Sequence, residues 1–270
     1  MVQTTLHPRP SRFTGPVAAL RTDWPLYLFE GAELATFMIS ACVMTVLLFD
    51  PAVTPIHHPW LARALMGIAM GLTAIGIIKS PWGRRSGAHF NPAITLCFYR
   101  LGKIGPYDAV FYIVAHFVGA VAGVGTAALA LGRSIAVPQV DYAVTVPGVG
   151  GAPAAFAAET FMAGLMMTVV LFTSNRPRLA PYTTWCMGFL IANYIFFLAP
   201  VSGFSVNPAR TVGSAVFAHV WTAIWLYFAA PLLGMLGAAE VYVRMAQPEA
   251  VPNGVRRYFS HRHLVQRNRL

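Results

Sequence analysis

Apolar residues are arranged along this chain in six long runs and two short ones. A helix needs roughly 20 apolar residues to cross the ~30 Å hydrocarbon core of a bilayer. The long runs meet this length and lie at about 26–49, 61–79, 108–131, 154–174, 182–200 and 220–243. The short runs, at about 91–100 and 207–217, cannot cross it. The pattern predicts an all-α membrane protein with six transmembrane helices and two short additional helices.

The composition agrees with a location in a bilayer. Apolar residues make up 57% of the 270 residues and charged residues only 10%, which excludes an ordinary soluble domain. The three cysteines, Cys42, Cys97 and Cys186, lie in or beside apolar runs without metal-ligand spacing, so we interpret them as packing residues. We find no motif for a metal, a cofactor or a catalytic nucleophile and therefore do not expect an enzyme.

An eight-residue phrase occurs twice, at Ser86–Ala93 and at Ser202–Ala209. In both copies a Ser-Gly turn leads to Asn-Pro-Ala and then to an apolar run. This order is typical of an Asn cap followed by Pro in the first turn of a helix. We therefore predict that two short helices begin at the two boxes, which consist of Asn91, Pro92 and Ala93, and of Asn207, Pro208 and Ala209.

The repeat divides the chain into two halves with inverted topology, because three spans in each half bring the second copy in from the opposite side. Non-helical backbone is tolerated at membrane depth only where protein or water satisfies it, so two re-entrant loops indicate a water-lined path. The expected segments are a basic arm, 1–25, a first half, 26–131, an outer connecting loop, 132–153, a second half, 154–243, and a basic tail, 244–270.

Basic residues predict the orientation. Sixteen of the 19 Lys and Arg residues fall on the side of the two termini, which the positive-inside rule places in the cytoplasm. The other three are Arg63, Arg133 and Arg210. We interpret the basic tail as a solvated anchor beside the lipid bilayer and expect no nucleic-acid partner. Short loops are typical of a bacterial inner membrane protein.

Two acidic residues, Glu33 and Glu159, each lie early in the first span of their half. Ionisable residues are costly in such a place, so we expect them to face the interior and to accept hydrogen bonds from backbone N–H groups of the re-entrant loops. A proton relay is the alternative, but no chain of acidic or histidine residues connects them. His89, inside the first phrase, is either a hydrogen-bonded structural residue or a candidate for gating or lining the pore.

The paired Asn-Pro-Ala boxes, the Ser-Gly-Ala-His before the first box, the Arg after the second and the Glu in each half resemble the aquaporins of the major intrinsic protein family. The resemblance covers about residues 26–243. It implies a right-handed bundle of six tilted helices and two half-helices, usually a homotetramer with one pore in each subunit. In this arrangement helix dipoles and the Asn amides exclude cations and pass water.

The resemblance also implies an outer selectivity filter. Arg210 and Phe204 match two of its positions directly, and counting back from Asn207 gives Ile195. The filter position in the second span is Met70 if this chain has one more residue than the family pattern near 81–83, and Gly71 if it has none. Ile195 and Phe204 differ from the residues typical of strict water channels.

We expect a passive channel for water that excludes ions and protons. Glycerol, urea, peroxide or neutral metalloid acids are candidate additional solutes, and a glycerol-type facilitator is the alternative. Thr211 and Ala215 differ from the Asp and Lys that glycerol channels usually carry after the second box. A secondary transporter would require midplane ligands, and a closed-pore structural protein would conduct nothing.

Overall fold

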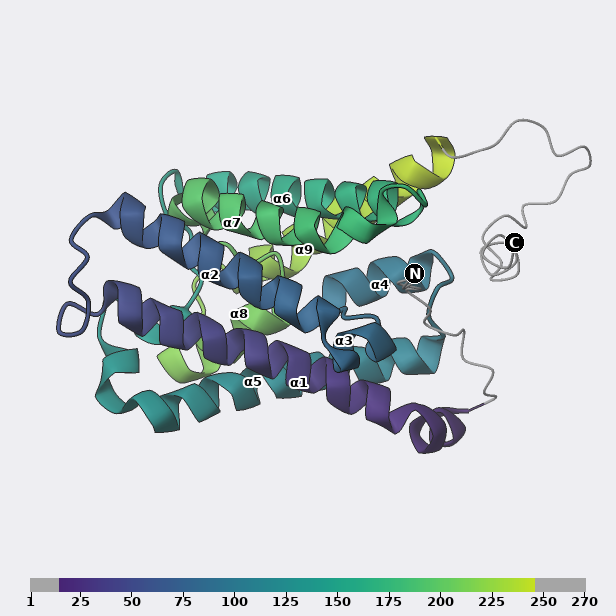
Figure 1. Cartoon of the computed structure of the whole chain (residues 1–270), viewed down its shortest axis with the longest axis horizontal. Helices are drawn as coiled ribbons and strands as arrows, with labels where there is room; N and C mark the ends of the chain where they lie inside the picture. The colour runs from purple at the N-terminus through teal and green to yellow at the C-terminus, as the bar shows by residue number, and fades with distance from the viewer. Residues whose placement is uncertain (1–14, 246–270) are drawn as a thin grey trace, which may run out of the picture.

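The computed structural model describes residues 15–245, which form a bundle of helices (Figure 1). Six long helices have the length and hydropathy of membrane spans: α1 (Pro16–Phe49), α2 (Pro59–Lys79), α5 (Pro106–Leu131), α6 (Gly151–Ser174), α7 (Thr183–Ser202) and α9 (Ile224–Met245). The shorter helices are α3 (Pro81–Ser86), α4 (Pro92–Arg100) and α8 (Pro208–Ala218), with 3₁₀ turns η1 (Gly132–Ala136), η2 (Asp141–Ala143) and η3 (Ala180–Tyr182). The predicted all-α membrane fold is confirmed.

The first helix begins earlier than the sequence pattern indicated. Residues 16–25, which we assigned to the basic arm, form the first turns of α1, because Pro16 suits a helix start and an apolar stretch follows it. Arg21 and Pro25 interrupt the apolar pattern there and concealed the helix. At 1.5 Å per residue α1 is roughly 50 Å long, so it extends beyond the hydrocarbon core. The remainder of the arm and the tail from residue 246 lie outside the described residues.

Small residues let the long helices approach closely. A Cβ atom added to Gly119 on α5 would overlap the backbone of Gly31 on α1. A Cβ added to Gly71 on α2 would overlap the carbonyl oxygen of Gly188 on α7. Helices in a bilayer associate through such close packing, because lipid supplies no hydrophobic force between them. These glycines therefore fix the pairs of helices that surround the two short half-helices.

The two halves repeat the same tertiary contacts. The Tyr112 hydroxyl on α5 donates to the carbonyl oxygen of Ser86 at 2.7 Å, and the Tyr227 hydroxyl on α9 donates to that of Ser202 at 2.6 Å. Each bond ties a long helix to the first residue of one eight-residue phrase. The internal repeat seen in the sequence is thus also a repeat in three dimensions.

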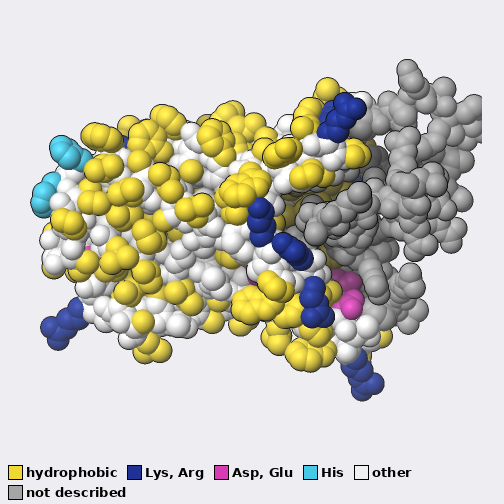
Figure 2. All heavy atoms as spheres, viewed as in Figure 1, with side chains coloured by type: hydrophobic (Ala, Val, Ile, Leu, Met, Phe, Trp, Pro, Cys, Tyr) yellow, Lys and Arg dark blue, Asp and Glu magenta, His cyan; other side chains and the backbone are white. Residues whose placement is uncertain are grey.

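The surface separates into an apolar body and a basic end. Figure 2 shows hydrophobic side chains over most of the visible face, with Lys and Arg side chains gathered toward the end where α1 begins and α9 finishes. Large apolar side chains project outward along several helices, among them Leu72, Val118 and Phe189. A broad exposed apolar surface of this kind fits a lipid environment. The chain is an integral membrane protein.

Candidate functional site

The half-helices α4 and α8 begin where the sequence predicted. Asn91 caps α4 through its Oδ1, which accepts a hydrogen bond from the N–H of Ala93 at 2.9 Å. Asn207 caps α8 in the same way, and its Oδ1 accepts from Ala209 at 3.1 Å and from Arg210 at 3.2 Å. The following proline occupies the first turn of each helix. The side-chain oxygen of each Asn is thereby used within its own helix.

The remaining amide groups join the two halves. Nδ2 of Asn91 donates to the carbonyl oxygen of Val206 at 2.7 Å, and Nδ2 of Asn207 donates to that of Phe90 at 2.8 Å. The two half-helices therefore meet with their N-termini, and each Asn contacts the loop that precedes the other. An amide nitrogen carries two N–H groups, so each Asn keeps one donor for a passing molecule. The ends of two helix dipoles also place partial positive charge at this point.

A carboxylate holds each re-entrant loop from behind. Glu159 on α6 accepts the N–H of Ser205 at 2.8 Å, the N–H of Val206 and the hydroxyl of Ser202 at 2.7 Å. This is the contact that we expected of it. The carboxylate is fully buried, so its negative charge is stabilised by these donors rather than by water.

In the first half the corresponding contacts are made by Glu30, which the sequence reasoning missed. Glu30 accepts the N–H of His89 at 3.0 Å and that of Phe90 at 2.7 Å, and it is 2.8 Å from Nε2 of His116. Glu33 accepts only the Ser86 hydroxyl, at 2.9 Å, and its Oε2 has no partner among the described residues. We expected backbone bonds at Glu33, and the structure corrects this: Glu30, one helical turn earlier, makes them.

His89 lies behind the first loop. Its Nδ1 is 2.9 Å from the Thr95 hydroxyl, and its ring stacks on Phe98 with the centroids 4.8 Å apart. The side chain is 1% exposed, so it is enclosed by protein. These contacts favour a structural role over gating.

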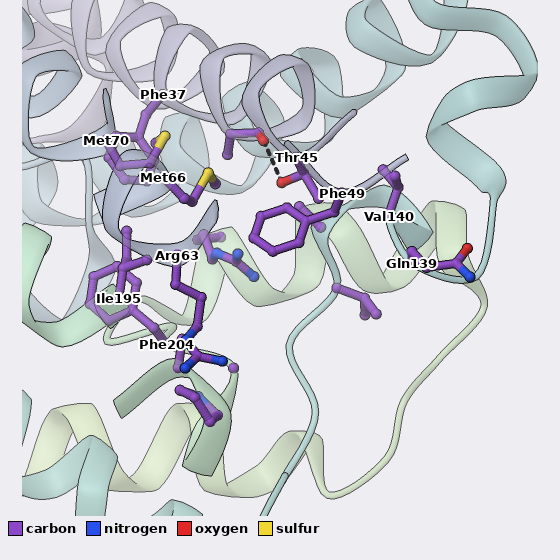
Figure 3. A pocket seen from close by; sticks show the side chains of 17 residues that line it. Phe37, Thr45, Phe49, Arg63, Met66, Met70, Gln139, Val140, Ile195 and Phe204 are labelled. Carbon is purple, nitrogen blue, oxygen red and sulfur yellow. Dashed lines mark hydrogen bonds between the residues drawn. The ribbon is translucent and has the colours of Figure 1, made fainter. Parts of the chain in front are cut away.

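All four residues that we assigned to the filter line one cavity of about 330 Å³, toward the end of the bundle where α1 finishes and α2 begins (Figure 3). They are Met70, Ile195, Phe204 and Arg210. We call this space the outer cavity, because the basic residues predict that this end faces outward. Met70 lines this cavity, whereas Gly71 packs against α7, so the geometry favours Met70 for the second-span position. Most residues that line the cavity are apolar, and Arg210 is one of its charged residues.

Arg210 follows the cap of α8 and is 8% exposed. Its Nη1 has no acceptor among the described residues. A guanidinium carries five N–H donors, so Arg210 can donate to a solute that passes the apolar walls. The outer connecting loop supports this region, since the Thr145 hydroxyl donates to that of Thr211 on α8 at 3.0 Å. A second arginine, Arg63 on α2, also lines the cavity and was not predicted to do so.

Comparison with known proteins agrees with this geometry. A sequence profile described as Major intrinsic protein matches residues 31–242. The chain belongs to the major intrinsic protein family. It is 36% identical, over 59% of its length, to a probable aquaporin NIP-type of Nicotiana alata, and it spans only 58% of that relative. It is 35% identical, over 64% of its length and 81% of the relative, to the glycerol uptake facilitator protein-like 6 of Lactiplantibacillus plantarum.

A solved member of the family shares the fold. The aquaglyceroporin of Plasmodium falciparum superposes with a TM-score of 0.71 over 84% of this chain and 98% of that one, at 19% identity. The fold of this chain is thus also that of the solved aquaglyceroporin. At this identity the likeness concerns the fold and not the solute.

Proposed function

We propose that the protein is a passive channel for water and small uncharged solutes that excludes ions and protons. The observation that carries the proposal is the meeting of Asn91 and Asn207, whose amides bond to each other's loops, in a bundle whose cavity is lined by Arg210. The helix N-termini and Arg210 repel cations at two successive levels. A neutral solute that exchanges hydrogen bonds meets no such barrier.

The filter supports passage of more than water. Met70, Ile195 and Phe204 give apolar walls to a cavity that the Arg210 guanidinium also lines, a combination that suits a solute with a carbon face and hydroxyl groups. The relatives carry both kinds of name, an aquaporin and a glycerol uptake facilitator. Water is therefore our primary solute, with glycerol, urea, peroxide and neutral metalloid acids as candidates beside it.

A channel explains the buried carboxylates better than a carrier does. Glu30 and Glu159 accept hydrogen bonds from the N–H groups of the loops, and one oxygen of Glu33 accepts the Ser86 hydroxyl. They hold the loops rather than forming a site open to the path, and a secondary transporter would need ligands exposed at the midplane. The residues of the two Asn-Pro-Ala boxes and those that line the cavity include no nucleophile paired with a base, which an enzyme would require.

We infer a homotetramer with one pore per subunit, in a bacterial inner membrane, with both termini in the cytoplasm. Lys and Arg side chains gather at the end of the bundle where α1 begins and α9 finishes (Figure 2), and the positive-inside rule places this end in the cytoplasm. The family resemblance supports the tetramer.

Stopped-flow light scattering on proteoliposomes tests the proposed function. Water permeability is measured first, then that of glycerol, urea and the other candidates, each against empty liposomes. We expect fast water flux and a measurable flux of at least one solute. Folded protein that gives no water flux above empty liposomes would overturn the proposal and favour a closed-pore structural protein, while saturable, gradient-coupled uptake would favour a carrier.

A further inference from the structure

The outer cavity holds a second arginine that the filter does not explain. Arg63 lies near the start of α2 and lines the same cavity as Arg210. Met66 and Met70 follow it at helical spacing and line the cavity too, so one face of α2 carries all three. Figure 3 shows Arg63 between these methionines and Phe204. Arg63 is therefore part of the vestibule just outside the filter.

Neither arginine of the cavity has a carboxylate of the described residues in direct contact, although the buried Glu159 lies near enough to Arg210 to act on its charge. The residues that line the cavity include both arginines and no Asp or Glu. Neither arginine takes part in the ion pairs found among residues 15–245. Asp50 and Asp141 do not line the cavity, and Asp50 accepts the N–H of Ala52 at 2.9 Å. The vestibule thus carries two positive charges in a space of about 330 Å³.

Both guanidinium groups also have N–H donors to spare. Nε of Arg63 and Nη1 of Arg210 are buried and have no acceptor among the described residues. A buried donor without an acceptor lowers the stability of the fold, so a ligand that accepts these hydrogen bonds is favoured. The planar fork of a guanidinium matches the two oxygens of a carboxylate.

We propose that Arg63 and Arg210 form a vestibular binding site for a small monocarboxylate anion such as formate or acetate. The carboxylate accepts hydrogen bonds from the two guanidiniums, and the apolar walls near Phe37 and Ile195 contact the C–H of formate or the methyl group of acetate. The bound anion occupies the entrance to the filter and slows the passage of neutral solutes. This slowing rests on the proposed channel function, whereas the binding itself does not.

A simpler role for Arg63 would be to add to the repulsion of cations. Repulsion needs no acceptor and no saturable site, so it predicts no binding of formate. It also predicts that removal of any outer positive charge has a comparable effect through the long-range field. Arg133 offers the matched control, because it is exposed on the same side of the membrane and does not line the cavity.

Isothermal titration calorimetry of the detergent-purified full chain with sodium formate, at constant ionic strength, tests the site. We expect saturable binding by the wild type, binding about tenfold weaker in Arg63→Gln, as for loss of a charge-assisted hydrogen bond, and unchanged binding in Arg133→Gln. Arg63→Lys should bind with intermediate affinity, because it keeps the charge and loses the fork. Absence of binding by the wild type, or an equal loss in Arg133→Gln, overturns the proposal.

Water flux into proteoliposomes, with formate added on the outside, tests the consequence. The wild type should slow as formate saturates the site, and Arg63→Gln should need about ten times more formate for the same effect. If formate binds but the wild type conducts no water, the channel proposal fails and the site stands. If water passes and formate neither binds nor slows it, the site fails and the channel stands.

Discussion

The loop before α4 and the loop before α8 carry the same eight-residue phrase and are held by the same kind of carboxylate, yet their surroundings differ. Behind the first loop lies a dense buried polar group formed by Glu30, Glu33, His89 and His116. Behind the second loop, Glu159 is the buried carboxylate that accepts its N–H groups. Tyr112 and Tyr227 correspond by their contacts, but four residues later α5 has His116 where α9 has Pro231.

The second loop differs from the first in what it presents to the cavity. Phe204 precedes the second box and Arg210 follows it, and both line the outer cavity. The first loop contributes no residue to that cavity, and its His89 is buried behind it. The residues that the two phrases share therefore form a common scaffold. The residues that differ have separate roles: in the first loop they add buried contacts, and in the second they line the cavity where solutes would be selected.

The largest effect is expected from removing the carboxylate behind the second loop. Glu159→Ala leaves two backbone N–H groups and the Ser202 hydroxyl buried without acceptors. We therefore expect the free energy of unfolding to fall by about 3–5 kcal/mol and water flux to be lost. Thermal unfolding in detergent and stopped-flow permeability measure the two effects. The control is Glu240→Ala, which breaks an exposed pair with Arg100 and should cost less than about 1 kcal/mol. Equal stability of the two variants would contradict our assignment.

The first half offers a sharper version of the same test, because two carboxylates lie one turn apart. Glu30→Ala removes the acceptor of two loop N–H groups and leaves His116 unpaired, so we expect a loss of about 3 kcal/mol. Glu33→Ala removes one hydroxyl contact and should cost about 1 kcal/mol. Thermal unfolding of the two variants decides the order. The reverse order would show that Glu33 holds the loop.

A smaller effect is expected where the second loop faces the cavity. Arg210→Val removes the filter cation while keeping the cap that Asn207 makes to the backbone. Proton flux should rise about tenfold, equivalent to ~1.4 kcal/mol of lost barrier. A pH-sensitive dye trapped in proteoliposomes measures this flux. Unchanged proton and solute fluxes in a folded variant would show that Arg210 does not form the filter.

The smallest effect concerns the apolar wall. Phe204→Ser should lower the ratio of glycerol to water permeability roughly fivefold, because about 1 kcal/mol of apolar contact with the carbon chain is lost. Phe204→Leu keeps an apolar side chain and serves as the control. If both variants keep the wild-type ratio, Phe204 does not contact the solute.

The sequence predicted the parts that depend on local pattern. The two Asn caps and the six spans follow from residue order, and the family resemblance led to Met70, Ile195, Phe204 and Arg210, which the structure brings to one cavity. The alignment to the family supplied the filter positions, but it left Met70 and Gly71 as alternatives for the position in the second span. The glycine contacts that separate these two residues are visible only when α2 and α7 pack together.

Other features depend on contacts between distant segments and were missed. Glu30 and Glu33 both fit the pattern of an acidic residue early in a span. The similar sequences around Glu33 and Glu159 led us to assign the loop contacts to Glu33 and not to Glu30. The backbone N–H groups that distinguish them come from residues about 60 positions away. Arg63 was counted only as an outer charge, because nothing in the residue order shows that the start of α2 faces the vestibule.

The central claim is that the two Asn caps and the filter arginine form one path that passes water and stops protons. The most direct test measures both fluxes on the same proteoliposomes, one by light scattering and the other by a trapped pH-sensitive dye. We predict water permeability well above that of empty liposomes and proton permeability equal to it. Proton flux that rises together with water flux, or folded protein that conducts neither, would contradict the account.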